Sequence, residues 1–173
     1  MSAGKHCEIE RKYLIRYPDA ALLTAQPGCE TWDITQIYLR PGPGRETRRI
    51  RRVETGRQVK YFRASKRRVS DLSAIEDEAE ITGDEYDALR RQRDLGRSPI
   101  VKTRYRVPYH GHTLEFDIYP FWQDRAILEI ELDSEDEAAD IPGYVNVMWD
   151  VTGEAAYKNW QLAKRVPEDI IPE

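Results

Sequence analysis

The sequence contains little cysteine and little histidine. Two cysteines and three histidines stand among 173 residues, and Cys7 and Cys29 form no CxxC or related metal-ligand spacing. A cysteine-built zinc site and a disulfide framework are therefore excluded; one bridge stays open, but a reduced intracellular protein is the simpler expectation. His6, His110 and His112 are too sparse for a zinc site, and we expect them to be solvated.

A long hydrophobic run is also missing. No apolar stretch approaches the ~20 residues that are needed to cross a bilayer. Residues 1–10 are polar and charged, which does not fit a signal peptide. We therefore expect a soluble, cytoplasmic protein that has no membrane partner.

The net charge is small. Lys and Arg number 27 against 31 Asp and Glu, which gives a net charge of −4. Nucleic-acid binders are normally basic overall, so this balance argues against a nucleic-acid partner. Residues 40–68 contain twelve Lys and Arg against two acids, which keeps contact with nucleic-acid phosphates as a minor alternative.

Charged residues themselves are abundant. They make up 34% of the chain, against ~25% in an average globular protein, while hydrophobic residues make up 40%. The apolar fraction is sufficient for a core, so the excess charge must cover the surface or line a wet interior. The length fits one domain over residues 1–173.

Short alternating runs between turn residues indicate strands more often than helices. We expect strands over residues 6–16, 31–40, 46–53, 58–66, 72–81, 100–109, 113–119 and 126–132. We expect helices over residues 19–25, 86–93 and 152–164, and a short capped helix that starts at Ser134. The predicted fold class is α+β, dominated by antiparallel sheet.

The charges inside these strands share faces, because residues two apart in a strand point the same way. An antiparallel sheet with one solvated face also alternates in this manner. Here, however, whole strands are largely of one sign, although like charges at neighbouring positions repel. Acidic residues dominate in the first, fifth and last predicted strands, at Glu8, Glu10, Glu76, Glu78, Glu80, Glu129 and Glu131. Basic residues dominate in the third, fourth and sixth, at Arg49, Arg51, Lys66, Lys102, Arg104 and Arg106.

A closed barrel of eight strands would make this segregation physically sensible. Its interior is wide enough for side chains or one small ligand. Buried charges must be wet, paired or matched by the charge of a ligand. Carboxylates suit hydrated Mg²⁺ or Mn²⁺, whereas arginine and lysine suit polyphosphate. We therefore predict a closed eight-stranded antiparallel β-barrel with a few peripheral helices, which binds a metal–triphosphate complex.

These residues resemble the motifs of the CYTH domain, also called the triphosphate tunnel metalloenzyme family. The resemblance covers nearly the whole chain and follows the family's order. The matching segments are Glu8-Ile9-Glu10-Arg11-Lys12 (ExExK), Arg49-Ile50-Arg51 (RxR), Lys66, Glu76-Asp77-Glu78 (ExE), Lys102-Thr103-Arg104-Tyr105 (KxRY), the strand with Asp117, Glu129-Ile130-Glu131 (late ExE) and Tyr157-Lys158-Asn159 (YxN).

The resemblance implies a role for each matching residue. Phosphate oxygens would be bound by Lys12, Arg49, Arg51, Lys66, Lys102 and Arg104. Mg²⁺ or Mn²⁺ would be held by Glu8, Glu10, Glu129 and Glu131. The catalytic group would be Asp117 with Glu76 and Glu78, which complete the metal shell or orient the attacking water. Tyr38 matches a family tyrosine near the tunnel, although a core aromatic residue is an equally good interpretation.

One position departs from the family pattern. Ala74 stands where close relatives often carry an arginine, so one phosphate contact is missing or replaced. Arg63, Arg67 and Arg68 are candidates for the replacement, and an exposed basic rim is the alternative interpretation.

The favoured function is hydrolysis of inorganic triphosphate to diphosphate and phosphate by a metal-dependent triphosphatase. The alternatives are hydrolysis of nucleoside or thiamine triphosphate, cyclisation of ATP in the manner of a class IV adenylate cyclase, and non-catalytic binding of polyphosphate or nucleotide. Four tryptophans could stack a base, but each is more often a core residue. The intact carboxylate pairs favour catalysis over simple binding. The oligomeric state stays open, with a homodimer as one option.

Overall fold

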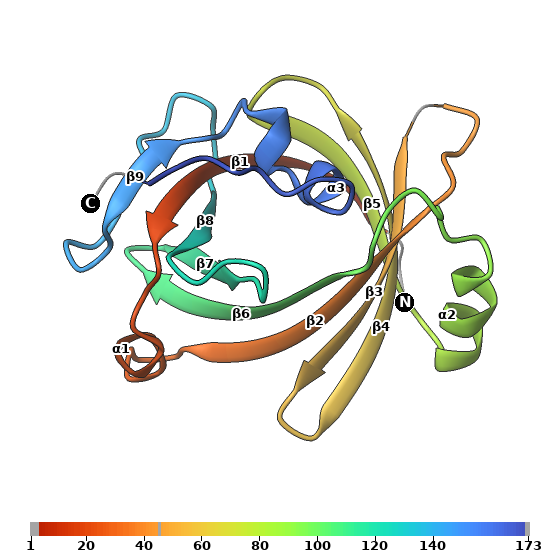
Figure 1. The fold of residues 1–173 in the computed structure, drawn as a ribbon, viewed down its shortest axis with the longest axis horizontal. Helices are drawn as coiled ribbons and strands as arrows, with labels where there is room; N and C mark the ends of the chain where they lie inside the picture. The colour runs from red at the N-terminus through yellow and green to blue at the C-terminus, as the bar shows by residue number, and fades with distance from the viewer. Residues whose placement is uncertain (1–3, 45, 172–173) are drawn as a thin grey trace.

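Nine antiparallel strands form one sheet in the computed structural model, which describes residues 4–44 and 46–171 (Figure 1). The strands are β1 (Gly4–Arg16), β2 (Glu30–Leu39), β3 (Thr47–Thr55), β4 (Gln58–Arg68), β5 (Ser73–Ile81), β6 (Ile100–Tyr109), β7 (His112–Ile118), β8 (Arg125–Glu131) and β9 (Val147–Asp150). The helices are α1 (Ala20–Thr24), α2 (Gly83–Arg90), the 3₁₀ turn η1 (Ala155–Tyr157) and α3 (Asn159–Leu162).

The sheet closes on itself through β1. Its order is β5-β4-β3-β2-β6-β7-β8-β1-β9, and β5 also pairs with the first half of β1. β8 pairs with the second half of β1, from Glu10 to Arg16. Strands β1 to β8 therefore form a closed eight-stranded barrel, as predicted, and β9 continues the edge of β1 beyond β5.

Turn and cap residues explain the local boundaries. Gly56 has φ of 58°, a conformation that glycine adopts without strain, and it closes the β3–β4 hairpin. Thr82 and Glu85 form a capping box at the start of α2. These signals set the ends of elements that the sequence placed within a few residues.

One predicted helix is wrong, a second is interrupted, and β9 was not predicted. After Ser134 the chain makes a single turn, because the Glu137 carboxylate accepts a hydrogen bond from the Asp133 N–H instead of capping a helix. The predicted helix over residues 152–164 is broken into η1 and α3, since Lys158 is extended with ψ of 139°. Thr152 instead accepts the backbone N–H of Lys12 at 3.0 Å and so belongs to the barrel edge.

Alternation along the strands sorts side chains into two environments. Outside the barrel, Ile15, Leu114, Phe116 and Leu128 belong to an apolar cluster that also contains Leu23 of α1. Full burial of such a side chain contributes ~1.5–3 kcal/mol. A second outer cluster joins β2 and β3 to α2, which lies against this side of the barrel in Figure 1.

The inward side chains are charged along most of the barrel but apolar where β1 ends. Leu14 faces the same side as Lys12 and packs with Ile127 of β8 and Ile100 of β6. Leu162 of α3 belongs to the same cluster. The C-terminal segment thereby covers part of this end of the barrel.

Within residues 4–44 and 46–171, none of the helices combines the length and the apolar character that a membrane span requires.

Candidate functional site

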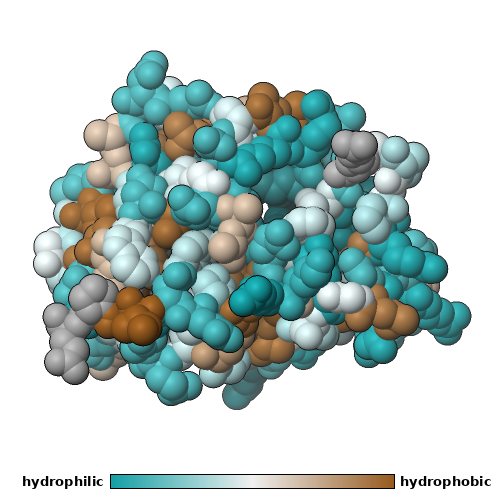
Figure 2. All heavy atoms as spheres, turned by 45° about the horizontal axis from the view of Figure 1, so that its top comes forward, coloured by the Kyte–Doolittle hydropathy of each residue, from teal (hydrophilic) through white to brown (hydrophobic). Residues whose placement is uncertain are grey.

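The barrel interior contains a cavity of about 650 Å³. Figure 2 shows that the visible face of the molecule is largely hydrophilic and is hollowed near its middle. All site residues predicted from the sequence line the cavity except Asp117, which is fully buried. The lining members of that set are Glu8, Glu10, Lys12, Arg49, Arg51, Lys66, Glu76, Glu78, Lys102, Arg104, Glu129 and Glu131.

Strands β1 and β8 place the acidic residues of the cavity side by side. In their register Glu10 lies opposite Glu131, and Lys12 lies opposite Glu129. The Lys12 Nζ is 2.8 Å from Glu129 Oε1, and both side chains are almost completely buried. On the other side of Glu10, Glu8 forms an ion pair of 2.7 Å with Lys66 of β4.

Glu10 and Glu131 have no ion-pair partner within residues 4–44 and 46–171. Burial and the nearby carboxylate of Glu129 raise the pKa of Glu10 above its ordinary value. Burial and the carboxylate of Glu8 likewise raise the pKa of Glu131. Carboxylates that repel one another and lack a cation form an all-oxygen donor set. Such a set fits a hard divalent ion such as Mg²⁺ or Mn²⁺.

The wall formed by β3 and β5 carries two arginines that are each held by a glutamate. The Arg49 Nη2 donates to both carboxylate oxygens of Glu76, at 3.0 and 2.7 Å. Arg51 forms the corresponding ion pair with Glu78. The Nε atoms of both arginines are buried and have no hydrogen-bond partner in the described part of the chain. Each arginine therefore keeps one buried N–H that no acceptor among the described residues satisfies.

Strands β6 and β7 contribute a buried network around Asp117. Its carboxylate accepts from the Lys102 Nζ at 2.5 Å and from the Arg104 Nε at 2.6 Å. The Arg104 Nη2 continues to Glu129 at 2.7 Å, and its Nη1 is paired with Glu115. Burial lowers the pKa of Lys102, and so does the adjacent guanidinium. Asp117 thus positions two cations that line the cavity.

Glu129 lies where the acidic and basic parts of the cavity meet. Burial by itself would raise the pKa of Glu129, but the nearby charges of Lys12 and Arg104 hold that pKa well below its ordinary value. It is therefore a carboxylate with two cationic partners, in contrast to Glu10.

Sequence reasoning missed three charged residues that line the cavity: Asp71, Glu115 and Lys158. Glu115 precedes Asp117 by two positions in β7, so the alternation rule would have placed both on the inner face. Lys158 lies between η1 and α3, where no periodic pattern exists. Burial and the positive charges of Lys12 and Arg68 lower the pKa of Lys158 to about 8. The described part of the chain offers Lys158 no ion-pair partner.

The structure also places the residues that the sequence left open. Tyr38 is buried and lines the cavity, and its hydroxyl accepts from the Gln36 Nε2 at 2.7 Å. Ala74 lines the cavity without adding a charge. Arg67 and Arg68, at the end of β4, also line the cavity, but both are exposed and Arg68 is paired with Asp71.

Comparisons with known proteins were made by sequence and by structure. No protein-family model matches the sequence, and no curated protein matches it either. Among solved structures, the inorganic triphosphatase NE1496 is 27% identical, with a TM-score of 0.55, over 92% of this chain and 99% of that chain.

Two further solved structures share the fold. The PH1819 protein from Pyrococcus horikoshii OT3 is 22% identical over 75% of this chain and 80% of that chain, with a TM-score of 0.55. The PH1012 protein from the same organism is 18% identical over the same shares, with a TM-score of 0.51. With its closed eight-stranded barrel, its ordered charged motifs inside that barrel and its likeness to an inorganic triphosphatase, the chain has the triphosphate tunnel (CYTH) fold.

Proposed function

We propose that this protein hydrolyses inorganic triphosphate to diphosphate and phosphate in the barrel cavity, with Mg²⁺ or Mn²⁺ as its cofactor. The observation that carries this proposal is the coexistence of two unsatisfied charge sets in one cavity. In the described part of the chain, Glu10 and Glu131 have raised pKa values and no ion-pair partner, while Arg49 and Arg51 keep unpaired buried donors. The likeness to the inorganic triphosphatase NE1496 supports the same activity.

The phosphate groups would be bound by the basic walls. Guanidinium groups bind phosphate oxygens through several donors, and lysine acts as a point charge. The basic residues predicted to bind phosphate line the cavity from β3, β4 and β6 and from β1: Arg49, Arg51, Lys66, Lys102, Arg104 and Lys12. Lys158 would add a charge from the C-terminal segment. Together they would neutralise the negative charge that develops on the leaving diphosphate, which is the main task in phosphoryl transfer.

The metal would be held by Glu8, Glu10, Glu129 and Glu131. A bound divalent ion supplies a water of lowered pKa and screens the phosphate charge. Glu10 and Glu131 would bind it without giving up a partner. Glu8 would exchange its contact with Lys66, which leaves that ammonium free for a phosphate oxygen.

In the ligand-free structure the remaining carboxylates accept hydrogen bonds from the basic side chains of the cavity. Glu76 holds Arg49 through two hydrogen bonds, and Asp117 holds Lys102 and Arg104. We propose that these carboxylates keep the basic side chains aligned for the substrate. Alignment of this kind lowers the barrier, because fixed charges need no reorganisation during the reaction.

The two tryptophans of the cavity favour an inorganic substrate over a nucleotide. Trp32 and Trp160 both line the cavity. The guanidinium of Arg106 lies 4.3 Å from the ring centre of Trp32, and that of Arg97 lies 3.5 Å from the ring centre of Trp160. A base could stack on these faces only after it displaced an arginine.

The test is phosphate release from inorganic triphosphate, ATP and thiamine triphosphate, each with Mg²⁺, with Mn²⁺ and with EDTA. We expect metal-dependent turnover of inorganic triphosphate above that of the other two, and its loss in Glu10→Gln. Glu54→Gln is the matched control, because Glu54 pairs with Arg52 on the surface and does not line the cavity. Tight binding of triphosphate without turnover of any substrate would refute the hydrolase.

A further inference from the structure

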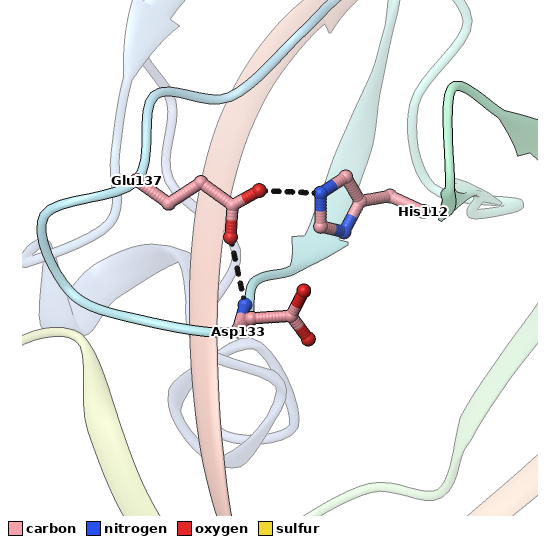
Figure 3. A group of neighbouring side chains, drawn as sticks. All are labelled: His112, Asp133 and Glu137. Carbon is pink, nitrogen blue, oxygen red and sulfur yellow. Dashed lines mark hydrogen bonds and ion pairs between the residues drawn. The ribbon is translucent and has the colours of Figure 1, made fainter.

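Three metal-ligating side chains meet outside the barrel cavity. His112 stands at the start of β7, and Asp133 and Glu137 belong to the turn after β8. One nitrogen or oxygen atom from each residue lies within 4.8 Å of those of the other two (Figure 3). None of the three lines the barrel cavity. The group is therefore separate from the site described above.

Hydrogen bonds orient the imidazole of His112. Its Nδ1 lies 3.1 Å from the backbone carbonyl oxygen of Glu131, which can only accept, so Nδ1 carries a hydrogen. Its Nε2 faces a carboxylate oxygen of Glu137 at 2.6 Å. A neutral ring in this orientation would point a lone pair at the carboxylate. A positive charge is therefore required between the two groups, and either a proton or a metal ion can supply it.

A metal ligand is normally held in this way. An imidazole that binds a metal through one nitrogen usually donates its other N–H to a carbonyl or carboxylate, which fixes the ring. The Glu137 carboxylate is fixed as well, because its second oxygen accepts from the Asp133 N–H at 2.9 Å. Figure 3 shows the contacts of the Glu137 carboxylate with the His112 ring and with the Asp133 N–H, and the Asp133 carboxylate near the ring. Two of the three donor groups, those of His112 and Glu137, are thus each oriented by a hydrogen bond to the backbone.

The turn that carries the two carboxylates is anchored a second time. Glu135 accepts a hydrogen bond from the Ser70 hydroxyl at 2.7 Å and is paired with the Ser73 hydroxyl. These serines lie at and just before the start of β5, on the far side of β1 from β8. The turn therefore crosses β1 between fixed points, so its carboxylates are not on a free loop.

We propose that His112, Asp133 and Glu137 form a second metal site, selective for Zn²⁺ or a similar borderline cation. One imidazole nitrogen and two carboxylate oxygens are a common zinc donor set, with water in the fourth position. The imidazole separates this site from the all-oxygen cluster of the barrel, which suits harder ions. Tetrahedral zinc with bonds of about 2 Å needs donors about 3.3 Å apart. The 2.6 Å contact between His112 and Glu137 must therefore open by about 0.7 Å, and the Asp133 carboxylate, which lies within 4.8 Å of the other donors, must approach by at most about 1.5 Å.

The proposal predicts zinc binding that does not depend on catalysis. Zinc content would be measured after dialysis against ~10 µM Zn²⁺, together with the imidazole NMR resonances during a zinc titration. We expect the His112 resonances to shift with zinc in the wild-type protein. We expect His112→Ala and Glu137→Gln to weaken this site by more than the ~10–100-fold that loss of an outer partner costs.

Two control variants separate the sites. His110 lies in the same hairpin and is also paired with a carboxylate, that of Asp140. It is not one of the proposed ligands, so His110→Ala should retain the zinc. Glu10→Gln alters the barrel cluster and should also retain the zinc at His112. Glu137→Gln keeps the shape of the turn, so it tests the proposal even if His112→Ala fails to fold. Zinc content unchanged in both site variants, or His112 resonances that follow pH but ignore zinc, would overturn the proposal.

Discussion

Glutamine in place of Glu10 should stabilise the ligand-free protein. Burial and the carboxylate of Glu129 raise the pKa of Glu10 above its ordinary value of 4.5, so the charged form costs folding free energy at neutral pH. Glutamine removes that charge and keeps the size of the side chain. We expect a gain of about 1 kcal/mol. In a chain of this length, 1 kcal/mol raises Tm by about 2–4 °C.

The same substitution at Glu129 should have the opposite sign. Burial raises the pKa of Glu129, but Lys12 and Arg104 outweigh it and lower that pKa well below the ordinary value. Glu129→Gln leaves both cations buried without their shared carboxylate. Removing one partner of a buried pair costs about 3–5 kcal/mol. Glutamine still accepts one hydrogen bond, so we expect about 3 kcal/mol and a fall in Tm of about 6–12 °C.

The assay is thermal unfolding of wild type and both variants in EDTA, between pH 4 and pH 8. Below pH 4.5, Glu10 is protonated in the folded and the unfolded state, so the advantage of Glu10→Gln should vanish there. The contribution of Glu129 is complete above pH 4.5 and is lost as the pH falls through its lower folded pKa. A Glu10→Gln protein that is less stable than wild type at pH 7 in EDTA would refute the reasoning. Activity alone would not, because both variants should be inactive.

Two further substitutions test the basic walls. Asp117→Asn removes the fully buried carboxylate that holds Lys102 and Arg104. We expect this substitution to lower the unfolding free energy by about 3 kcal/mol in a urea titration. A loss below about 1 kcal/mol, which is what we expect for the exposed control Glu54→Gln, would contradict this. The pKa of Lys158 is lowered to about 8, so KM for triphosphate should rise above that pH as the ammonium loses its proton. Lys158→Arg should abolish that rise and Lys158→Ala should raise KM about tenfold at pH 7, whereas a wild-type KM that is flat to pH 10 would exclude a role in binding.

The barrel and most of its lining could be predicted from the sequence because strand geometry is simple. Alternation places Glu8, Glu10 and Lys12 on one face of β1, and all three line the barrel cavity. The same rule applied to Glu115 would have added one more residue of the lining. Local propensity and turn chemistry then set the strand ends to within a few residues.

The rest depends on contacts between segments that are distant in the sequence. Lys158 reaches the cavity only because η1 and α3 pack across the end of the barrel, and its own neighbours show no period. β9 has four residues and exists through its pairing with β1. The partner of each cation is also set by the stagger of the strands. Arg49 on β3 meets Glu76 on β5, two strands away, and no spacing in the sequence encodes that pair.

The ion pairs of the ligand-free cavity imply that metal and substrate bind cooperatively. Lys66 is paired with Glu8 and Lys12 with Glu129, so triphosphate alone would take the lysines, which would leave Glu8 without this partner and Glu129 with Arg104 alone. A divalent ion alone would bind the glutamates and leave both lysines without these carboxylate partners. When both bind, every charge keeps an opposite partner. We therefore expect saturating Mg²⁺ to raise triphosphate affinity by about 10–100-fold, within the usual range of coupling free energies.

The coupling is measured by calorimetry. The Glu10→Gln protein is unsuitable because it lacks one of the metal ligands, so the measurement needs the wild-type protein and a triphosphate analogue that resists hydrolysis. Its affinity would be determined with Mg²⁺ and with EDTA. Linkage requires the analogue to raise the affinity for Mg²⁺ by the same factor. Lys66→Met should reduce that factor, because Glu8 then has no ammonium to exchange for the metal. Equal affinities with Mg²⁺ and with EDTA would show that the carboxylates and the cations of the cavity act independently, and that its ion pairs serve the stability of the barrel alone.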